Sequence, residues 1–134
     1  MSTENQLAPD TSWQAAILVV DDNEIIRGLV RIFLQSEGYS VLSAADGRSA
    51  LELSRKYPGT IDLVITDVEM PRLRGIDLVP YLLKERPGIK VIVMTGRQGT
   101  DIAFPTLFKP FDGKMLTTKV REVLASSGRS KAAS

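Results

Sequence analysis

The chain contains neither cysteine nor histidine. The absence of cysteine excludes disulfide bonds, thiolate metal sites and cysteine nucleophiles. The absence of histidine excludes imidazole bases and Ser-His-Asp triads. Neither sign of charge dominates, since 17 Lys and Arg residues accompany 16 Asp and Glu residues, for a net charge of +1. Any chemistry must therefore use carboxylates, hydroxyls, lysine, arginine, backbone groups or a metal ion with oxygen ligands.

Long hydrophobic runs are also absent. The longest, Ala15–Val20, is far too short to span a bilayer, and the polar N-terminus has no signal-peptide pattern. The chain has no Walker-type phosphate loop and no basic stripe with interleaved aromatic residues. We therefore expect a cytoplasmic protein with no membrane insertion and no direct nucleic-acid binding.

The composition that is present fits one folded domain. The chain has 134 residues, of which 43% are hydrophobic and 25% charged. Residues 1–14 and 126–134 are predicted to be flexible tails, because they are polar or small and lack apolar periodicity. The domain is expected to occupy residues 15–125.

Short apolar runs alternate with segments of helical periodicity. This alternation predicts an α/β fold, with a parallel sheet covered by helices on both faces and right-handed crossovers. Asp112 is placed to cap the last helix. The predicted strands are residues 16–21, 39–44, 61–66 and 89–94, with a fifth near 107–108.

Two segments depart from regular alternation. Only 13 residues, Gly96–Phe108, separate Thr95 from Lys109, and Gly96, Gly99 and Pro105 disfavour a helix there. We expect a fourth helix that is absent or about one turn long. Pro80 lies in the third helical segment, which must either be perturbed if it begins at Gly75 or begin nearer Asp77.

Polar side chains follow the predicted strands where a parallel sheet places its ligands, beyond the carboxyl ends. Each alone has a structural explanation: Asp22 could cap a helix, for example, and Asp67 could lie in a turn before Pro71. Their coincidence at four of five strand ends predicts a site. The residues are Asp21, Asp22, Asp67, Thr95 and Lys109.

The chemistry of such a site favours phosphoryl transfer. Three neighbouring carboxylates repel one another unless a cation neutralises them, and Mg²⁺ suits an all-oxygen set. Lys109 would add positive charge for an incoming anion. A carboxylate beside Mg²⁺ and lysine is a plausible phosphoryl acceptor.

Four motifs in this order resemble the receiver domain of bacterial two-component response regulators. The resemblance covers roughly residues 15–125. The motifs are LVVDDNE (Leu18–Glu24), ITDVEMPRLRG (Ile65–Gly75), VIVMTG (Val91–Gly96) and FKPF (Phe108–Phe111).

The resemblance implies a flavodoxin-like, three-layer fold with a five-stranded sheet of order 2-1-3-4-5. It implies that Asp67 accepts a phosphoryl group from a sensor histidine kinase or a histidine phosphotransfer protein. Asp22, Asp67 and the backbone carbonyl of Glu69 would bind Mg²⁺, and Asp21 would act through metal-bound water.

The resemblance also assigns roles around the phosphoryl group. Lys109 would pair with its oxygens, Thr95 would donate a hydroxyl to it, and Gly96 would leave room for it. The loop-shaping residues would be Pro71, Gly75 and Pro110, the last after a cis Lys109–Pro110 bond. Receivers usually carry an aromatic switch residue where this chain has Thr106, which predicts an altered output face.

The leading interpretation is a stand-alone receiver that signals through protein–protein contacts. It would not be an enzyme beyond self-catalysed phosphotransfer and dephosphorylation, and its dimerisation surface remains open. One alternative is a pseudo-receiver that binds partners without phosphorylation. Another is an aspartate-nucleophile phosphatase, because Asp67-Val68-Glu69 resembles the paired acids of that class.

Overall fold

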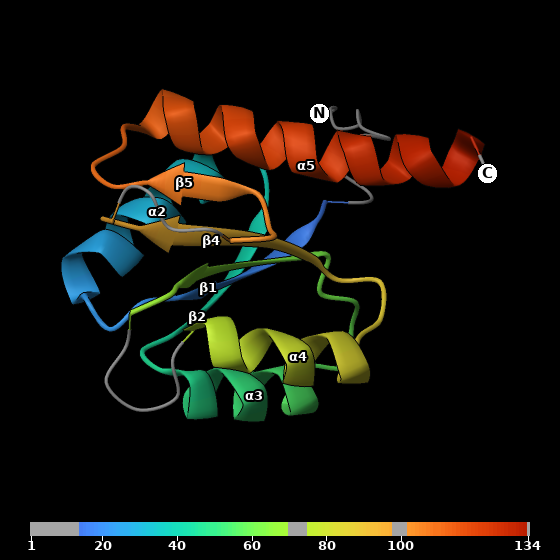
Figure 1. The fold of residues 1–134 in the computed structure, drawn as a ribbon, viewed down its shortest axis with the longest axis horizontal. Coiled ribbons are helices and arrows are strands. Elements are labelled where there is room, and N and C mark those ends of the chain that lie inside the picture. Colours follow the sequence, from blue (N-terminus) through green and yellow to red (C-terminus); the bar gives the residue numbers. More distant parts are fainter. Residues whose placement is uncertain (1–13, 70–74, 98–101, 134) are drawn as a thin grey trace, which may run out of the picture.

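Strands and helices alternate along the chain in the computed structural model, which describes residues 14–69, 75–97 and 102–133 (Figure 1). The expected tail at residues 1–14 lies, except for Gln14, outside the described residues. The elements are β1 (Ala16–Val20), α2 (Glu24–Ser36), β2 (Ser40–Ala44), α3 (Gly47–Lys56), β3 (Leu63–Asp67), α4 (Gly75–Glu85), β4 (Lys90–Thr95), β5 (Thr106–Phe108) and α5 (Gly113–Ala133).

The five strands form one parallel sheet of order β2-β1-β3-β4-β5, which confirms the predicted flavodoxin-like order. Helices α3 and α4 cover one face, and α2 and α5 cover the other (Figure 1). Alternate residues of the buried strands serve the two faces. Leu18 and Val20 pack on the α3/α4 side, whereas Ile17 and Val19 pack on the α2/α5 side.

Side-chain caps fix where the helices begin. The Asn23 carboxamide oxygen accepts the N–H groups of Ile25 and Ile26 at 2.9 and 3.1 Å. Asn23 therefore caps α2, which leaves the neighbouring Asp22 carboxylate free of that role. Asp112 accepts the Met115 N–H at 2.8 Å, as expected for the cap of α5.

Helix α4 begins at Gly75 and contains Pro80 in its interior. Of the two predicted starts of this helix, Gly75 and a residue nearer Asp77, the structure has Gly75. Proline has no N–H to donate to the Ile76 carbonyl, so α4 lacks one backbone hydrogen bond.

Helix α5 continues to Ala133, whereas the sequence pattern ended the folded part near residue 125. The tail predicted at 126–134 is thus helical over residues 126–133. Leu116 and Val120 anchor the helix on the core, so further turns need no new nucleation, and this outweighs the weak helix preference of Gly128 and the serines near it.

The connection from β4 to β5 contains no helix at residues 96–97 or 102–105, and residues 98–101 are outside the described part. Four residues cannot hold a three-turn helix, so the predicted loss of a full fourth helix is confirmed. Strand β5 has only three residues and pairs with Val93–Thr95. The first half of β4, Lys90–Ile92, therefore has no neighbouring strand on that side among the described residues.

Candidate functional site

The predicted site residues converge on the carboxyl edge of the sheet. Asp21 follows β1, and Lys109 follows β5. Asp67 and Thr95 are the last residues of β3 and β4, each strand running one residue further than predicted. The parallel order brings these four positions to one edge.

Three carboxylates form an acidic cluster at this edge, made of Asp21, Asp22 and Asp67. One oxygen of each lies within 4.8 Å of the others. Asp21 is fully buried, Asp67 is nearly so and Asp22 is exposed. Lys109 Nζ lies 3.1 Å from both Asp21 Oδ2 and Asp67 Oδ2, so one ammonium group bridges the two buried carboxylates.

Backbone N–H groups hold the other oxygens of the two buried carboxylates. Asn23 donates its N–H to Asp21 Oδ1 at 2.9 Å, and Glu69 donates its N–H to Asp67 Oδ1 at 3.0 Å. Each carboxylate thus has one oxygen on the backbone and one on Lys109. These contacts among the protein's own groups fix the orientations of the Asp21 and Asp67 carboxylates.

The site shifts the ionisation of two groups. Burial raises the pKa of Asp21 because it disfavours the charged form, and the nearby Asp67 charge adds to this; the Asn23 N–H and Lys109 oppose the shift only in part. Burial alone would lower the pKa of Lys109. Its contacts with Asp67 and Asp21 outweigh that effect and raise the pKa above its usual value, so Lys109 stays cationic.

Thr95 and Lys109 are joined through the backbone. The Lys109 N–H donates to the Thr95 carbonyl at 2.8 Å, and the Lys109–Pro110 bond is cis, as predicted. The buried Thr95 Oγ1 accepts the Arg97 N–H at 3.1 Å. A Cβ added at Gly96 would meet nothing within 4 Å, so there is open space beside the site.

The remaining predicted residues lie around the loops. Glu69 is exposed, and its carboxylate pairs with Arg97 Nε at 3.0 Å. Gly75 begins α4, and Pro71 lies outside the described residues. The structure therefore assembles the acidic cluster, Thr95 and Lys109, and brings Glu69 beside them through its N–H.

Arg27 is a site neighbour that the sequence reasoning missed. Its Nη1 donates to the Asp21 backbone carbonyl at 2.7 Å. This contact ties the first turn of α2 to the end of β1. The available signal was its position on α2, one helical turn after the cap residue Asn23.

A family model described as "Response regulator receiver domain" matches residues 17–121. The chain belongs to the response regulator receiver domain family. Proteins of this family are regulatory phosphoacceptors in two-component signalling, and they interact with histidine kinases and effectors.

Parts of a sensor kinase and of a transcriptional regulator resemble this chain in sequence. Sensor kinase CckA of Brucella abortus (strain 2308) is 40% identical over 126 residues, which are 87% of this chain and 13% of CckA. Transcriptional regulatory protein CpxR of Escherichia coli (strain K12) is 34% identical over 120 residues, which are 83% of this chain and 50% of CpxR. The receiver chain thus spans half or less of these two proteins.

Solved receiver structures have the same fold. Chemotaxis protein CheY4 of Vibrio cholerae superposes with a TM-score of 0.77 at 30% identity, covering 83% of this chain and 99% of that chain. Response regulator TrrA of Thermotoga maritima, solved in complex with Mg²⁺-BeF, has a TM-score of 0.72 at 34% identity and covers 82% of this chain and 99% of that chain.

The acidic cluster fits the Mg²⁺ that receiver domains bind in an acidic pocket. Its ligand atoms are carboxylate oxygens, which Mg²⁺ prefers, and the exposed Asp22 leaves one side open to water. In the described part of this receiver, no helix is both long and apolar enough to cross a membrane.

Proposed function

We propose that this receiver takes a phosphoryl group on Asp67 from a histidine kinase or histidine phosphotransfer protein and signals through protein–protein contacts. The observation that carries the proposal is the Lys109 ammonium, held 3.1 Å from both Asp67 and Asp21. A cation in that position can neutralise charge that arrives on a phosphoryl group.

The proposed step needs little covalent chemistry from the protein. An oxygen of Asp67 forms a bond to phosphorus while the P–N bond to the donor imidazole breaks, and the imidazole leaves with the electron pair. The Glu69 N–H holds the Asp67 carboxylate in position. Lys109 then pairs with a phosphoryl oxygen, and Thr95 donates its hydroxyl to another, since accepting the Arg97 N–H leaves the hydroxyl proton free to donate.

Asp22, Asp67 and the Glu69 carbonyl would hold Mg²⁺, and Asp21 would act through bound water. When bound, the ion supplies positive charge for the phosphoryl oxygens. Asp21 also holds Lys109 at the site through its Oδ2. The same residues support slow self-catalysed dephosphorylation. We place the action of the protein in the cytoplasm and its receiver domain at residues 15–125, from which the last turns of α5 extend.

A surface beside the acidic cluster supports docking of the phosphodonor protein. Ile25, Leu29 and Ile32 of α2 are exposed by 74%, 48% and 59%. Leu29 also lines a hollow of about 400 Å³ that reaches Lys109 of the site itself. Its lining residues are Ile26, Leu29, Val30, Phe33, Lys109, Pro110 and Phe111. A donor resting here would place its phosphohistidine next to Lys109.

Labelling tests the proposal. The purified chain is incubated with acetyl phosphate and Mg²⁺, and the added phosphoryl group is detected by intact mass. We expect labelling of the wild type and of Asp62→Asn, a control carboxylate that accepts the Ala16 N–H elsewhere on the sheet. We expect none for Asp67→Asn. An unlabelled wild type would favour the pseudo-receiver, and turnover of small phosphoesters would favour the phosphatase.

A further inference from the structure

Strand β4 has an open edge beside its first half. Val93 donates its N–H to the Pro105 carbonyl at 2.9 Å, and Thr95 accepts the Lys109 N–H, so these two residues bond toward β5. Lys90 and Met94 bond in the opposite direction, toward β3. Because hydrogen-bonding direction alternates along a strand in a parallel sheet, the N–H and C=O of Val91 also point toward the β5 side.

Strand β5 does not reach Val91. Continuing the parallel ladder by one step would require residue 105 to donate to the Val91 carbonyl, but Pro105 has no N–H. Ala103 would have to accept the Val91 N–H, and no such bond forms. Val91 is only 5% exposed, and within the described part of the chain its N–H and C=O toward β5 have no hydrogen-bond partner. An unpaired buried backbone group is costly, which favours a ligand that pairs with both.

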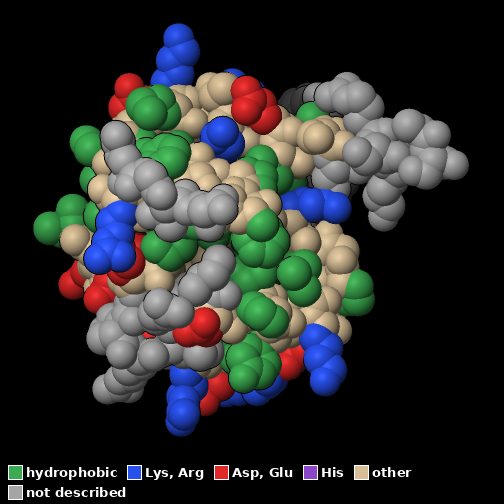
Figure 2. Space-filling view, in the orientation of Figure 1, with side chains coloured by type: hydrophobic (Ala, Val, Ile, Leu, Met, Phe, Trp, Pro, Cys, Tyr) green, Lys and Arg blue, Asp and Glu red, His purple; other side chains and the backbone are tan. Residues whose placement is uncertain are grey.

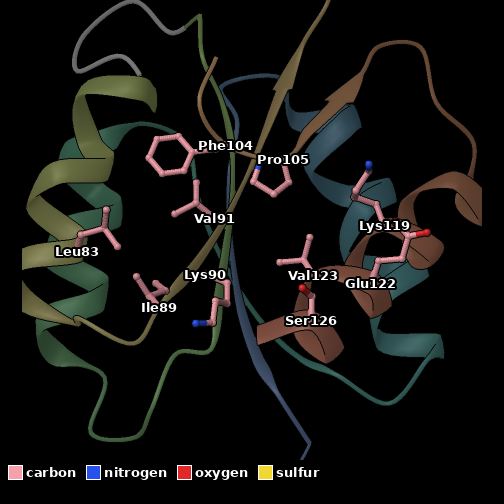
Figure 3. Close-up of a pocket in the computed structure, with 10 residues that line it drawn as sticks. All are labelled: Leu83, Ile89, Lys90, Val91, Phe104, Pro105, Lys119, Glu122, Val123 and Ser126. Atoms are coloured by element: carbon pink, nitrogen blue, oxygen red, sulfur yellow. The ribbon is translucent and has the colours of Figure 1, made fainter. Parts of the chain in front are cut away.

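A groove of about 590 Å³, here called the edge groove, lies along this edge. Its lining residues are Leu83, Ile89, Lys90, Val91, Phe104, Pro105, Lys119, Glu122, Val123 and Ser126. In Figure 2, hydrophobic side chains gather on this face between the layers that contain α4 and α5. Figure 3 shows Leu83 and Phe104 on the α4 side of β4, and Lys119 and Val123 on the α5 side.

The lining charges favour an acidic ligand. Lys90 and Lys119 are half-buried, and neither ammonium group has an ion-pair partner among the described residues. Glu122 is the one acidic lining residue in the described part, and it is exposed. A carboxylate seated on the α5 side would meet Lys119.

We propose that the edge groove binds an extended segment of another protein, which adds to the sheet as a strand beside Lys90–Ile92. Its backbone would pair with the N–H and C=O of Val91, since strand addition uses unpaired edge groups. Side chains alternate along a strand, so apolar residues would face Leu83 and Phe104 and acidic residues would face Lys119. About four residues, roughly 13 Å, would fill the groove.

This proposal goes beyond the receiver function and does not depend on it. The edge groove lies at the start of β4, whereas the acidic cluster lies at the end of the sheet marked by Thr95. Labelling of Asp67 tests the receiver function separately.

A library of random peptides of about ten residues, displayed on phage, tests the proposal with the full chain as bait. We expect enriched sequences that alternate apolar with Asp or Glu residues. A synthetic copy of an enriched peptide should slow hydrogen exchange of the Val91 amide. Lys119→Glu should weaken its binding by about tenfold. Lys114→Glu should not, because Lys114 lies on the same helix but outside the edge groove.

N-methylation of the peptide provides a test that needs no protein variant. Each backbone amide of the peptide is methylated in turn. Methylation of every second amide should abolish binding, because only every second amide faces β4. Methylation of the amides between them should leave binding unchanged. The proposal would be overturned if no peptide were enriched or if bound peptide left hydrogen exchange of the Val91 amide unchanged. It would also be overturned if the methylations that abolish binding did not fall on every second amide. Protection of Val91 that rises with protein concentration in the absence of peptide would assign the edge groove to a second copy and would also overturn it.

Discussion

Asp21 is the most buried member of the acidic cluster, and its ionisation opposes folding when no metal is bound. Its pKa in the folded chain is raised by burial above the ordinary value near 3.8. A raised folded pKa gives stability that is fully present below the unfolded pKa and is lost as pH rises through the folded pKa. Above that window the buried charge lowers the free energy of unfolding.

Replacing Asp21 with a neutral isostere should therefore stabilise the metal-free fold. In EDTA at neutral pH, we expect Asp21→Asn to melt a few degrees above the wild type, measured by circular dichroism. Below the ordinary pKa of an aspartate, the two proteins should melt at similar temperatures. A variant that melts lower than the wild type at neutral pH would contradict the ionisation argument.

Asp22 is the exposed member of the acidic cluster, so it can change with little effect on the core. A ligand that binds only the folded chain raises the melting temperature. We expect saturating Mg²⁺ to stabilise the wild type and Glu52→Ala, an exposed acid on α3, by similar amounts. The increase should largely disappear in Asp22→Ala. Equal increases in all three proteins, confirmed by calorimetric titration, would remove Asp22 from the metal site.

At the scale of elements, Gly113 and Phe33 set how closely α5 approaches α2. A Cβ added at Gly113 would lie 2.5 Å from the Phe33 ring. Gly113→Ala should therefore cost about 1–2 kcal/mol of unfolding free energy in urea, since overpacking outweighs the helix preference of alanine. Gly28→Ala in α2 is the matched control, because its Cβ would meet nothing within 4 Å. The unfolding free energy of Gly28→Ala should rise by up to about 1 kcal/mol, because alanine favours helix over glycine.

Arg86 joins the end of α3 to the end of α4. Its Nε donates to Ser54 Oγ at 2.8 Å, and its Nη2 donates to the Ser54 and Tyr57 carbonyls at 2.7 and 3.0 Å. Its Nη1 donates to the Gly59 carbonyl at 2.8 Å. These carbonyls lie at or just past the end of a helix, where intrahelical partners run out. Lysine cannot reproduce this planar set of donors.

We expect Arg86→Lys to lower the unfolding free energy by about 1–3 kcal/mol, measured by urea denaturation. The control is Arg55→Lys, which changes the same residue type in the exposed Arg55–Glu85 ion pair of 2.7 Å. That change should lower the unfolding free energy much less than Arg86→Lys does, because solvent screens an exposed ion pair. Equal losses for the two variants would show that the Arg86 bonds do not join the helices.

The local sequence pattern predicted helices and strands well wherever buried apolar residues recur at regular spacing. Apolar runs located the strands, and Asp112 capped α5 as expected. The predicted end of α5, near residue 125, was wrong. The helix continues past the core, where its residues have no apolar periodicity that a sequence pattern could detect. Arg86 was missed because its partners lie about 30 positions away, and no local pattern encodes such contacts. The acidic cluster was found because strand ends converge in a parallel sheet whatever the exact boundaries are.

At the scale of the whole molecule, the surface of α2 proposed to dock the phosphodonor and the edge groove have no lining residue in common. Leu29 is exposed and lines the hollow that reaches Lys109. We expect Leu29→Glu to slow phosphotransfer from a cognate kinase by about tenfold or more, since a charge in an apolar contact costs well over 1 kcal/mol. Labelling by acetyl phosphate, which needs no docking, should stay unchanged. Equal slowing with both donors would show damage to the site itself.

Strand β5 links the stability of the sheet margin to the chemistry of the site. It is three residues long, lies at the end of the sheet order and is followed at once by Lys109. Such a margin opens with less free energy than the central strands, as one cooperative unit. Each opening would withdraw the Lys109 ammonium group from Asp21 and Asp67 together, so these two contacts would be lost before the core unfolds. The lifetime of the assembled site is therefore set by the opening of this short strand and not by global unfolding.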